Sequence, residues 1–223
     1  WGECGGFKHE DALRFEAAAM IAYGSRCSFG DQLHPCGEMN LETYRLIGAA
    51  YKYVKKIEPC GLDGVPCSNL GIWLSRQTPH DQGVANMLME SQLDFEVVSP
   101  AGDLAHYDTI ILPGGQCLDE PAAQKLTQYV KDGGGLLVLG QSALDAALKR
   151  FILDVGARYL GPGQHDCDYL LAGKDLAAGL VDAPMLCYQP ALRAEVENGD
   201  EIALLAKIRE PYFSRTYGKY CSH

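Results

Sequence analysis

The sequence has no long apolar run and no surplus of basic residues, and each absence argues against a class of partner. Its longest apolar runs, such as residues 109–112 and 136–139, are far shorter than the ~20 residues that span a bilayer. The 19 Lys and Arg stand against 29 Asp and Glu, which gives a formal net charge of −10. Because an acidic chain repels a phosphate backbone, we expect neither nucleic-acid nor membrane binding, whereas a neutral sugar is not disfavoured.

The nine cysteines include no C-x-x-C pair, which disfavours a structural zinc site. We interpret them as reduced residues that pack as small hydrophobes, which indicates a cytoplasmic protein. We expect no metal and no cofactor. Residue 1 is Trp rather than Met, so the chain looks like an excerpt or a product trimmed at its start.

The 223 residues divide into two segments of different character. The first covers residues 1–59 and the second residues 68–223. Residues 60–67 form the expected linker, because residues 58–66 hold two Gly and two Pro. We therefore predict two domains that are joined by an exposed connection.

Apolar periodicity in the first segment predicts two helices, over residues 11–23 and 40–56. Asn40 is the expected cap of the second helix. A short strand is expected over residues 26–29, and a loop follows it. This order is typical of the last units of an alternating α/β structure.

The second segment alternates strands with helices up to about residue 161. We expect strands over 70–75, 95–98, 109–112 and 136–139, and helices over 81–91, 120–132 and from about 143. Apolar strands joined by helices predict an α/β fold with a parallel sheet covered on both faces. Further along, residues 191–197 and 202–208 flank Asn198-Gly199 and predict a β-hairpin.

Two loops follow strands of this sheet, at the edge where doubly wound folds bind ligands. Residues 112–117 are Leu-Pro-Gly-Gly-Gln-Cys, and residues 139–143 are Leu-Gly-Gln-Ser-Ala. A turn at Gly114 and Gly115 can direct backbone amides into a cleft and build an oxyanion hole. The second loop occupies the place of a nucleophile elbow, the strand-to-helix turn that presents a catalytic side chain.

Residues 108–115 (DTIILPGG) and 133–140 (GGGLLVLG) resemble the class I glutamine-amidotransferase-like superfamily. The resemblance implies a flavodoxin-like, doubly wound parallel sheet. In active members a Cys stands at the elbow, and a His and a Glu follow later in the chain. This sequence has Gln141 and Ser142 there and no later His-x-Glu pair, so we expect a degenerate elbow and a non-catalytic copy of the fold.

The alternative is a small amidotransferase-like or thiol enzyme that uses Cys117 or Ser142. Amide dipoles at a strand end can activate a thiol beside a glycine turn. Nothing in the sequence pairs Cys117 with a base, however, and a half-buried loop cysteine is the competing interpretation.

A second resemblance covers the first segment. Residues 1–8 (WGECGGFK), residues 27–35 (CSFGDQLHP) and Glu58-Pro59 resemble the end of a glycoside-hydrolase (β/α)8 barrel. The group is that of the fucosidase-like and β-galactosidase-like enzymes that carry a β-galactosidase trimerisation domain. In that group an amidotransferase-like domain follows the barrel directly, so the resemblance implies the last βα units of a barrel over 1–59 and a trimerisation-type domain over 68–223.

Glycoside hydrolysis uses two carboxyl groups on loops at the top face of such a barrel. Asp31, Gln32 and His34 follow the expected strand and are candidates to hydrogen-bond sugar hydroxyls. Asp31 is equally suited to cap its own turn, and His34 to satisfy loop backbone. Glu3 is a candidate catalytic carboxylate, and the other catalytic residues cannot be assigned from the sequence.

About two βα units cannot close a barrel, which needs all eight strands. We therefore expect the chain alone to be inactive, as the oligomerisation or scaffold portion of a carbohydrate-active glycoside hydrolase. The resemblance implies a homo-oligomer, a trimer in particular, and a carbohydrate substrate for the intact enzyme.

Overall fold

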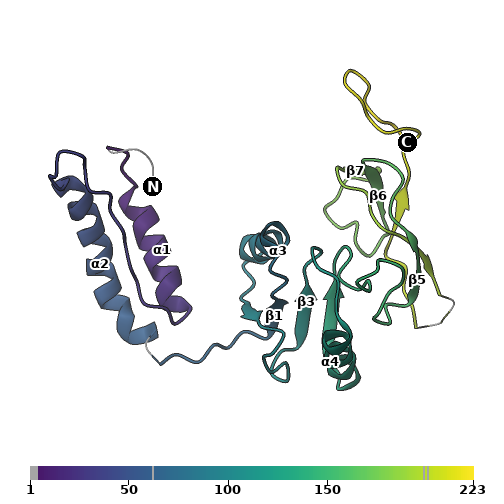
Figure 1. Cartoon of the computed structure of the whole chain (residues 1–223), viewed down its shortest axis with the longest axis horizontal. Coiled ribbons are helices and arrows are strands. Elements are labelled where there is room, and N and C mark those ends of the chain that lie inside the picture. Colours follow the sequence, from purple (N-terminus) through teal and green to yellow (C-terminus); the bar gives the residue numbers. More distant parts are fainter. Residues whose placement is uncertain (1–4, 62, 198, 200) are drawn as a thin grey trace. The chain divides into compact units, whose positions relative to one another are not determined.

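The computed structural model describes residues 5–61, 63–197, 199 and 201–223, and it divides into two compact units, Trp1–Cys67 and Ser68–His223 (Figure 1). Each unit is described by itself. The helices of the first unit are α1 (Glu10–Ala22) and α2 (Leu41–Gly61). The second unit holds α3 (Thr78–Glu90), α4 (Glu120–Lys131) and the strands β1 (Leu70–Trp73), β2 (Glu96–Val98), β3 (Thr109–Leu112), β4 (Gly135–Val138), β5 (Ala157–Gly161), β6 (Asp168–Ala172), β7 (Met185–Cys187), β8 (Arg193–Val196) and β9 (Ala206–Arg209).

The two helices of the first unit lie side by side and run in the same direction (Figure 1). Near their starts, Leu13 of α1 packs with Ile47 of α2. Near their ends, a Cβ atom on Gly61 would stand 2.6 Å from the carbonyl oxygen of Ile21. The segment that joins the helices must therefore return along them before α2 begins.

The predicted helices of this unit are confirmed, and α2 extends beyond its predicted end to Gly61. Asn40 caps α2 as expected, since its Oδ1 accepts hydrogen bonds from the N–H groups of Glu42 (3.0 Å) and Thr43 (3.4 Å). These bonds satisfy two of the N–H groups that a helix start leaves without an intrahelical partner.

The predicted strand over residues 26–29 is wrong. This segment packs against both helices through Cys27 and Phe29, and the hydroxyl of Tyr51 donates to the carbonyl oxygen of Cys27 at 3.4 Å. A strand needs the N–H and C=O groups of a neighbouring strand, and the described part of this unit offers none.

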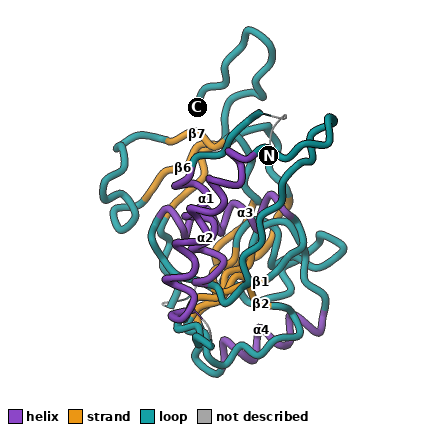
Figure 2. Tube along the Cα trace, turned by 90° about the vertical axis from the view of Figure 1, so that its left-hand side faces the viewer, coloured by secondary structure: helices purple, strands orange, loops and turns teal. Residues whose placement is uncertain are grey.

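A four-stranded parallel sheet in the order β2-β1-β3-β4 forms the centre of the second unit. Side chains alternate along β3, as the two-residue period of a strand requires. Ile110 and Leu112 pack in the cluster that α4 covers with Leu126, whereas Ile111 packs in the cluster that α3 covers. Figures 1 and 2 show the strands between these two helices.

The predicted parallel sheet is confirmed, but the helix expected from about residue 143 is absent. Residues 141–152 form turns in which Leu144 bridges Phe151, and the N–H of Ile152 donates to the carbonyl of Ala143 at 2.7 Å. The side chain of Asp145 accepts from the N–H of Lys149 at 2.9 Å. These contacts use backbone groups that a helix would need, and the chain turns back instead.

Two small antiparallel sheets complete the unit, β5-β8 and β7-β6-β9. The predicted hairpin of residues 191–197 and 202–208 is wrong, because β8 pairs with β5 and β9 pairs with β6. Asn198 and Asp200, in the expected turn, lie outside the described residues. The strands therefore take their partners from distant sequence rather than across the Asn-Gly turn.

Candidate functional site

The two loops singled out in the sequence meet at the carboxyl ends of β3 and β4. Gly140 has a φ of +53°, and a Cβ atom there would stand 3.1 Å from the Cα and 3.2 Å from the carbonyl oxygen of Gly114. The two backbones thus approach more closely than an ordinary side chain permits. The contact requires glycine at position 140, whereas a Cβ atom on Gly114 would stand 3.4 Å from its nearest neighbours, an ordinary contact distance.

His80, near the start of α3, lies over the turn of the β3 loop. A Cβ atom on Gly115 would clash with the His80 ring and would stand 2.6 Å from the Cβ of Gln77. The preceding turn is held by Ser75, whose hydroxyl donates to Asp81 at 2.6 Å and accepts from the N–H of Gln77 at 3.1 Å. His80 is a neighbour of the glycine turn that the sequence did not reveal, because the two are 35 residues apart.

Ser142 stands at the elbow but is buried, with 2% of its surface exposed. Its hydroxyl donates a hydrogen bond to the carbonyl oxygen of Pro113, and its N–H donates to the carbonyl oxygen of Leu139 at 3.2 Å. A serine nucleophile needs a base that accepts its proton and an open path to substrate. This hydroxyl has a backbone carbonyl as its acceptor and serves to join the two loops.

Cys117 is half-buried beside a cavity of about 170 Å³ that Trp73, Gln116, Asp119 and Ala146 help to line. Burial raises the pKa of the Cys117 thiol, and the nearby Asp145 carboxylate adds to the effect. A raised pKa leaves less thiolate near neutral pH, which is opposite to the tuning of a catalytic cysteine.

The candidate sugar-binding residues of the first segment lie in the connection between α1 and α2. Asp31 is exposed, and its Oδ1 accepts from the N–H of Gln32 at 2.8 Å, which is the turn-capping arrangement. His34 is half-buried, and its carbonyl accepts from the N–H of Gly37 at 2.8 Å. Glu3 lies outside the described residues. Of these side chains, that of Asp31 caps its own turn, and the part of Asp31, Gln32 and His34 in carbohydrate binding stays a prediction.

No group of His, Cys, Asp and Glu side chains among the described residues could hold a metal ion. Within that same part of the chain, no helix combines the length and apolarity that crossing a membrane requires.

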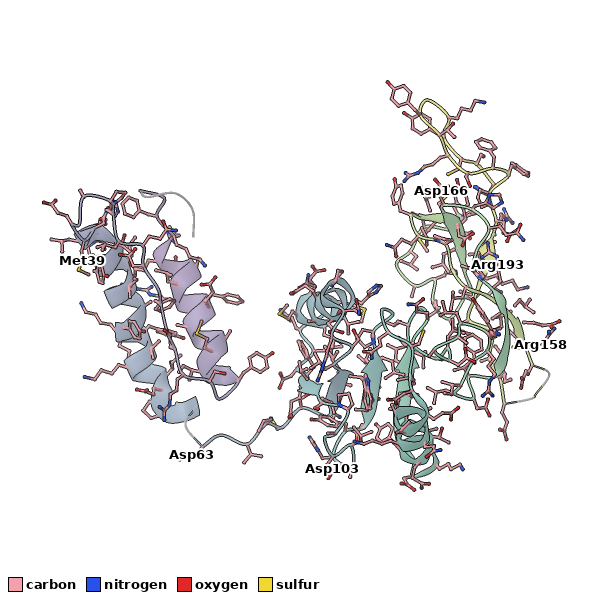
Figure 3. All side chains as sticks on the ribbon, in the orientation of Figure 1. Met39, Asp63, Asp103, Arg158, Asp166 and Arg193 are labelled. Atoms are coloured by element: carbon pink, nitrogen blue, oxygen red, sulfur yellow. The ribbon has the colours of Figure 1, made fainter. Side chains whose placement is uncertain are left out.

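A buried ion pair between Asp168 and Arg193 lies in the small sheets of the second unit. Asp168, at 0% exposure, accepts from Arg193 Nη2 at 2.9 Å on Oδ1 and from Arg193 Nη1 at 3.2 Å on Oδ2. The N–H of Ala191 donates to Oδ2 at 2.7 Å, and Arg193 Nε donates to Glu210 at 2.6 Å. The hydrogen bond to Asp168 is the main cause of the raised pKa of Arg193, which is labelled in Figure 3.

This cluster joins β6, β8 and the residue that follows β9, so it holds the two small sheets together. Sequence reasoning missed it, because Asp168 and Arg193 are separated by 25 residues and neither belongs to a motif. The only signal in the sequence was a charged residue next to an apolar run, Asp168 before residues 169–172.

Comparison with protein families gives one match. The family model described as "GLMA-like, second domain" matches residues 71–151, which hold almost all of the parallel sheet and the loops that follow β3 and β4. No curated protein matches the chain.

Comparison with solved structures gives matches over most of the chain. An α-L-fucosidase, isoenzyme 2 from Paenibacillus thiaminolyticus, is 33% identical with a TM-score of 0.84, covering 100% of this chain and 35% of that one. A β-galactosidase from Rahnella sp. R3 is 16% identical with a TM-score of 0.65, covering 90% of this chain and 35% of that one. The GH42 β-galactosidase Gan42B from G. stearothermophilus is 14% identical with a TM-score of 0.68, covering 94% and 35% respectively.

The chain therefore spans about a third of the length of each of these enzymes. The two β-galactosidases show likeness of fold, and the fucosidase adds likeness of sequence. The resemblance to the C-terminal part of glycoside hydrolases that carry a trimerisation-type domain is confirmed.

Proposed function

From this similarity to the C-terminal part of glycoside hydrolases, we propose that the chain is the non-catalytic oligomerisation or scaffold portion of such an enzyme. The similarity itself supports an accessory domain of a glycosidase. The absence of catalysis by the chain alone, the number of subunits and the substrate of the intact enzyme are parts of the proposal.

The proposal rests on the burial of Ser142 at the elbow. An amidotransferase presents its nucleophile on an open turn, whereas Ser142 is buried and donates to the Pro113 carbonyl. The neighbouring Gln141 has no nucleophilic atom, and its carbonyl accepts from the N–H of Leu144 at 2.9 Å. The turn therefore stabilises the sheet edge, and Gly114 and Gly115 act in loop contact rather than as an oxyanion hole.

We assign residues 68–223 to an amidotransferase-like, doubly wound domain of the trimerisation type. Residues 60–67 remain the proposed linker, although α2 extends into its first two residues. The parallel sheet with α3 and α4 on opposite faces supports this assignment. The strand β4 lies at the edge of this sheet, and the side chain of its Leu137 is 41% exposed.

We assign residues 1–59 to the last βα units of a (β/α)8 barrel. Parallel neighbouring helices with a returning segment between them are what two consecutive βα units of a barrel produce. In the whole enzyme, residues 26–29 would find the neighbouring strands that they need for pairing. Asp31, Gln32 and His34 would then lie on a strand-end loop and contact the carbohydrate substrate.

We also propose that the chain assembles as a homo-oligomer, and the resemblance favours a trimer. Subunit interfaces bury large apolar side chains that would otherwise contact water. Exposed side chains of this kind in the second unit include Leu160, Val181, Tyr188, Leu204 and Tyr212.

Two measurements on the full chain test the proposal. Light scattering coupled to gel filtration should give a mass above that of one chain, and a monomer at every concentration contradicts the oligomer. Assays with a panel of aryl glycosides and with glutamine should give no turnover. Robust glycoside hydrolysis by this chain would overturn the premise that two βα units cannot make the site.

The alternative enzyme, which would use Cys117 or Ser142, is tested in the same assays with two variants. Turnover that is lost in Cys117→Ser but kept in Ser142→Ala would establish a thiol enzyme. The opposite pattern would establish a serine enzyme. Any turnover that both variants keep would belong to neither residue and would point to a contaminant, which a second purification scheme removes.

A further inference from the structure

Two cysteines that are far apart in the sequence meet in the second unit. The Sγ atoms of Cys167 and Cys221 lie 3.1 Å apart, across 54 residues. Cys167 precedes β6 and is fully buried, whereas Cys221 is half-buried. A disulfide has an S–S distance of about 2.05 Å, so a movement of about 1 Å would bring the two sulfur atoms to bonding distance.

The segment over residues 211–223 brings Cys221 to this place through contacts with the start of β6. Cys167 and Tyr169 are two residues apart in extended backbone and so share one side of the strand. The Tyr169 hydroxyl donates to the carbonyl oxygen of Cys221 at 3.1 Å, and its oxygen lies 3.6 Å from Cys221 Sγ. The Tyr169 ring also packs on the ring of His223, with centroids 4.4 Å apart.

A second contact, between Arg215 and Asp166, attaches the first half of the same segment to the residues that precede β6. The N–H of Arg215 donates to Asp166 Oδ1 at 3.2 Å, and Arg215 Nε lies 3.4 Å from Asp166 Oδ2. Asp166 is labelled in Figure 3, at the base of the projecting loop. This ion pair is exposed and therefore weak, so it contributes little to holding the segment against β6.

We propose that Cys167 and Cys221 are a site of reversible disulfide formation, which cross-links the segment over residues 211–223 to β6 when a small-molecule disulfide is present. The inference goes beyond the accessory function proposed above and does not depend on it. It rests on the placement of two thiols by the fold.

The chemistry divides between the two sulfur atoms. The Cys221 thiolate attacks one sulfur of a low-molecular-weight disulfide such as oxidised glutathione, which forms a mixed disulfide and releases one thiolate. Cys167 then loses its proton to solvent, and its sulfur attacks Cys221 Sγ and displaces the second thiolate; the two released thiolates take up protons from solvent. The two protein thiols are thus oxidised to one disulfide, and one small disulfide is reduced to two thiols.

The electrostatics agree with these roles. The hydrogen bonds from Cys167 and from Tyr169 lower the pKa of the Cys221 thiol, which favours the attacking thiolate. Burial raises the pKa of the Cys167 thiol to about 11, with the hydrogen bond to Cys221 as the second cause. The more accessible sulfur therefore reacts first with reagents from solution, and the buried one resolves the adduct.

The test uses the full chain, equilibrated with mixtures of reduced and oxidised glutathione. Trypsin places the two cysteines in different peptides, residues 159–174 and residues 220–223. We expect these two peptides joined by a disulfide in the oxidised sample and separate after reduction. In the native reduced chain, iodoacetamide should label Cys221 before Cys167, and oxidation should abolish labelling of both.

Cys187→Ser is the matched control, because Cys187 is half-buried on β7 and pairs with Asp168 across the sheet. This variant should form the same cross-link, whereas Cys221→Ser should lose it and leave Cys167 unmodified. Cys221 joined to another cysteine or another chain, a lasting glutathione adduct on Cys221, or both thiols still free after oxidation would each overturn the proposal. Peptide mapping of the unsubstituted chain distinguishes these outcomes even if a variant fails to fold.

Discussion

Replacement of Asp168 by Ala removes the acceptor at the centre of the small sheets. Asp168 is fully buried, and Arg193, at 20% side-chain exposure, keeps its charge in any accessible pH range. Loss of the carboxylate leaves the guanidinium with Glu210 as its remaining acidic partner and deprives the Ala191 N–H of its acceptor. The change therefore leaves a partly buried charge without its main partner.

Breaking one partner of a buried ion pair costs about 3–5 kcal/mol in the free energy of unfolding, because the other charge stays desolvated. The matched control is Glu195→Ala, which removes the partner of Arg158 in an exposed pair with 66% and 60% side-chain exposure. An exposed pair contributes about 0–1 kcal/mol. The two variants each delete one carboxylate from a strand of the small sheets, and they differ in burial.

Hydrogen–deuterium exchange, read by mass spectrometry on peptides of β6 and β8, measures this difference locally. A local measurement is required because the chain holds two units, and one global midpoint would mix their unfolding. A loss of about 3 kcal/mol speeds exchange by roughly 100-fold, since about 1.4 kcal/mol is tenfold. Exchange in the parallel sheet should not change.

Exchange in β6 that Asp168→Ala speeds by less than about tenfold, or by no more than Glu195→Ala does, would refute this account of the ion pair. Asp168→Asn keeps the shape and one acceptor oxygen and should lie between the two. A uniform acceleration over both units would instead indicate global unfolding, and the local effect of the ion pair would be disproved.

Three further predictions follow from single positions. Gly140→Ala places a Cβ at positive φ against a neighbouring backbone and should lower the free energy of unfolding by about 1–3 kcal/mol, whereas Gly48→Ala, with open space in mid-helix, should raise it by about 0.5–1 kcal/mol. Hydrogen–deuterium exchange in peptides of β4 and of α2 compares the two variants, each in its own unit, and equal effects contradict the close contact. Iodoacetamide should label half-buried Cys117 more slowly than exposed Cys36 at pH 8, and faster labelling would revive the thiol enzyme. Burial, with a hydrogen bond to a glutamate, raises the pKa of Tyr107 to about 12, so its stabilising effect is complete below its ordinary pKa of about 10 and is lost as the pH rises toward 12. Tyr107→Phe should flatten the fall in the midpoint of the second unit's thermal transition, resolved from that of the first unit by calorimetry, and an unchanged fall counts against this assignment.

Local sequence determined most of the helices and the parallel strands. The apolar run over residues 109–112 is β3 as predicted, and α4 begins at Glu120 as predicted. Asp119 caps α4 by accepting from the N–H of Ala122 at 2.9 Å. Signals of this kind act within one or two turns of chain, so they are complete in the sequence.

The residues of the candidate site were predictable from the sequence, but the burial and the hydrogen bonds of their side chains were not. The Gly-rich loops and the substitution of Gln141 and Ser142 at the elbow are visible in the sequence. Whether the Ser142 hydroxyl faces solvent depends on the Pro113 carbonyl, which comes from the loop after another strand. The roles of Asp31, Gln32 and His34 in carbohydrate binding stay predictions.

Tertiary structure alone decided which distant groups meet. The strand expected at residues 26–29 lacks a neighbouring strand in the described part of its unit. The strands β8 and β9 do not pair with each other across the Asn-Gly turn, because β8 pairs with β5 and β9 pairs with β6. Asp168 forms an ion pair with Arg193 across 25 residues, and the thiols of Cys167 and Cys221 meet across 54 residues. Caps, turns and periodicity depend on neighbours in the chain, whereas pairing, burial and thiol proximity depend on which surfaces the folded chain brings into contact.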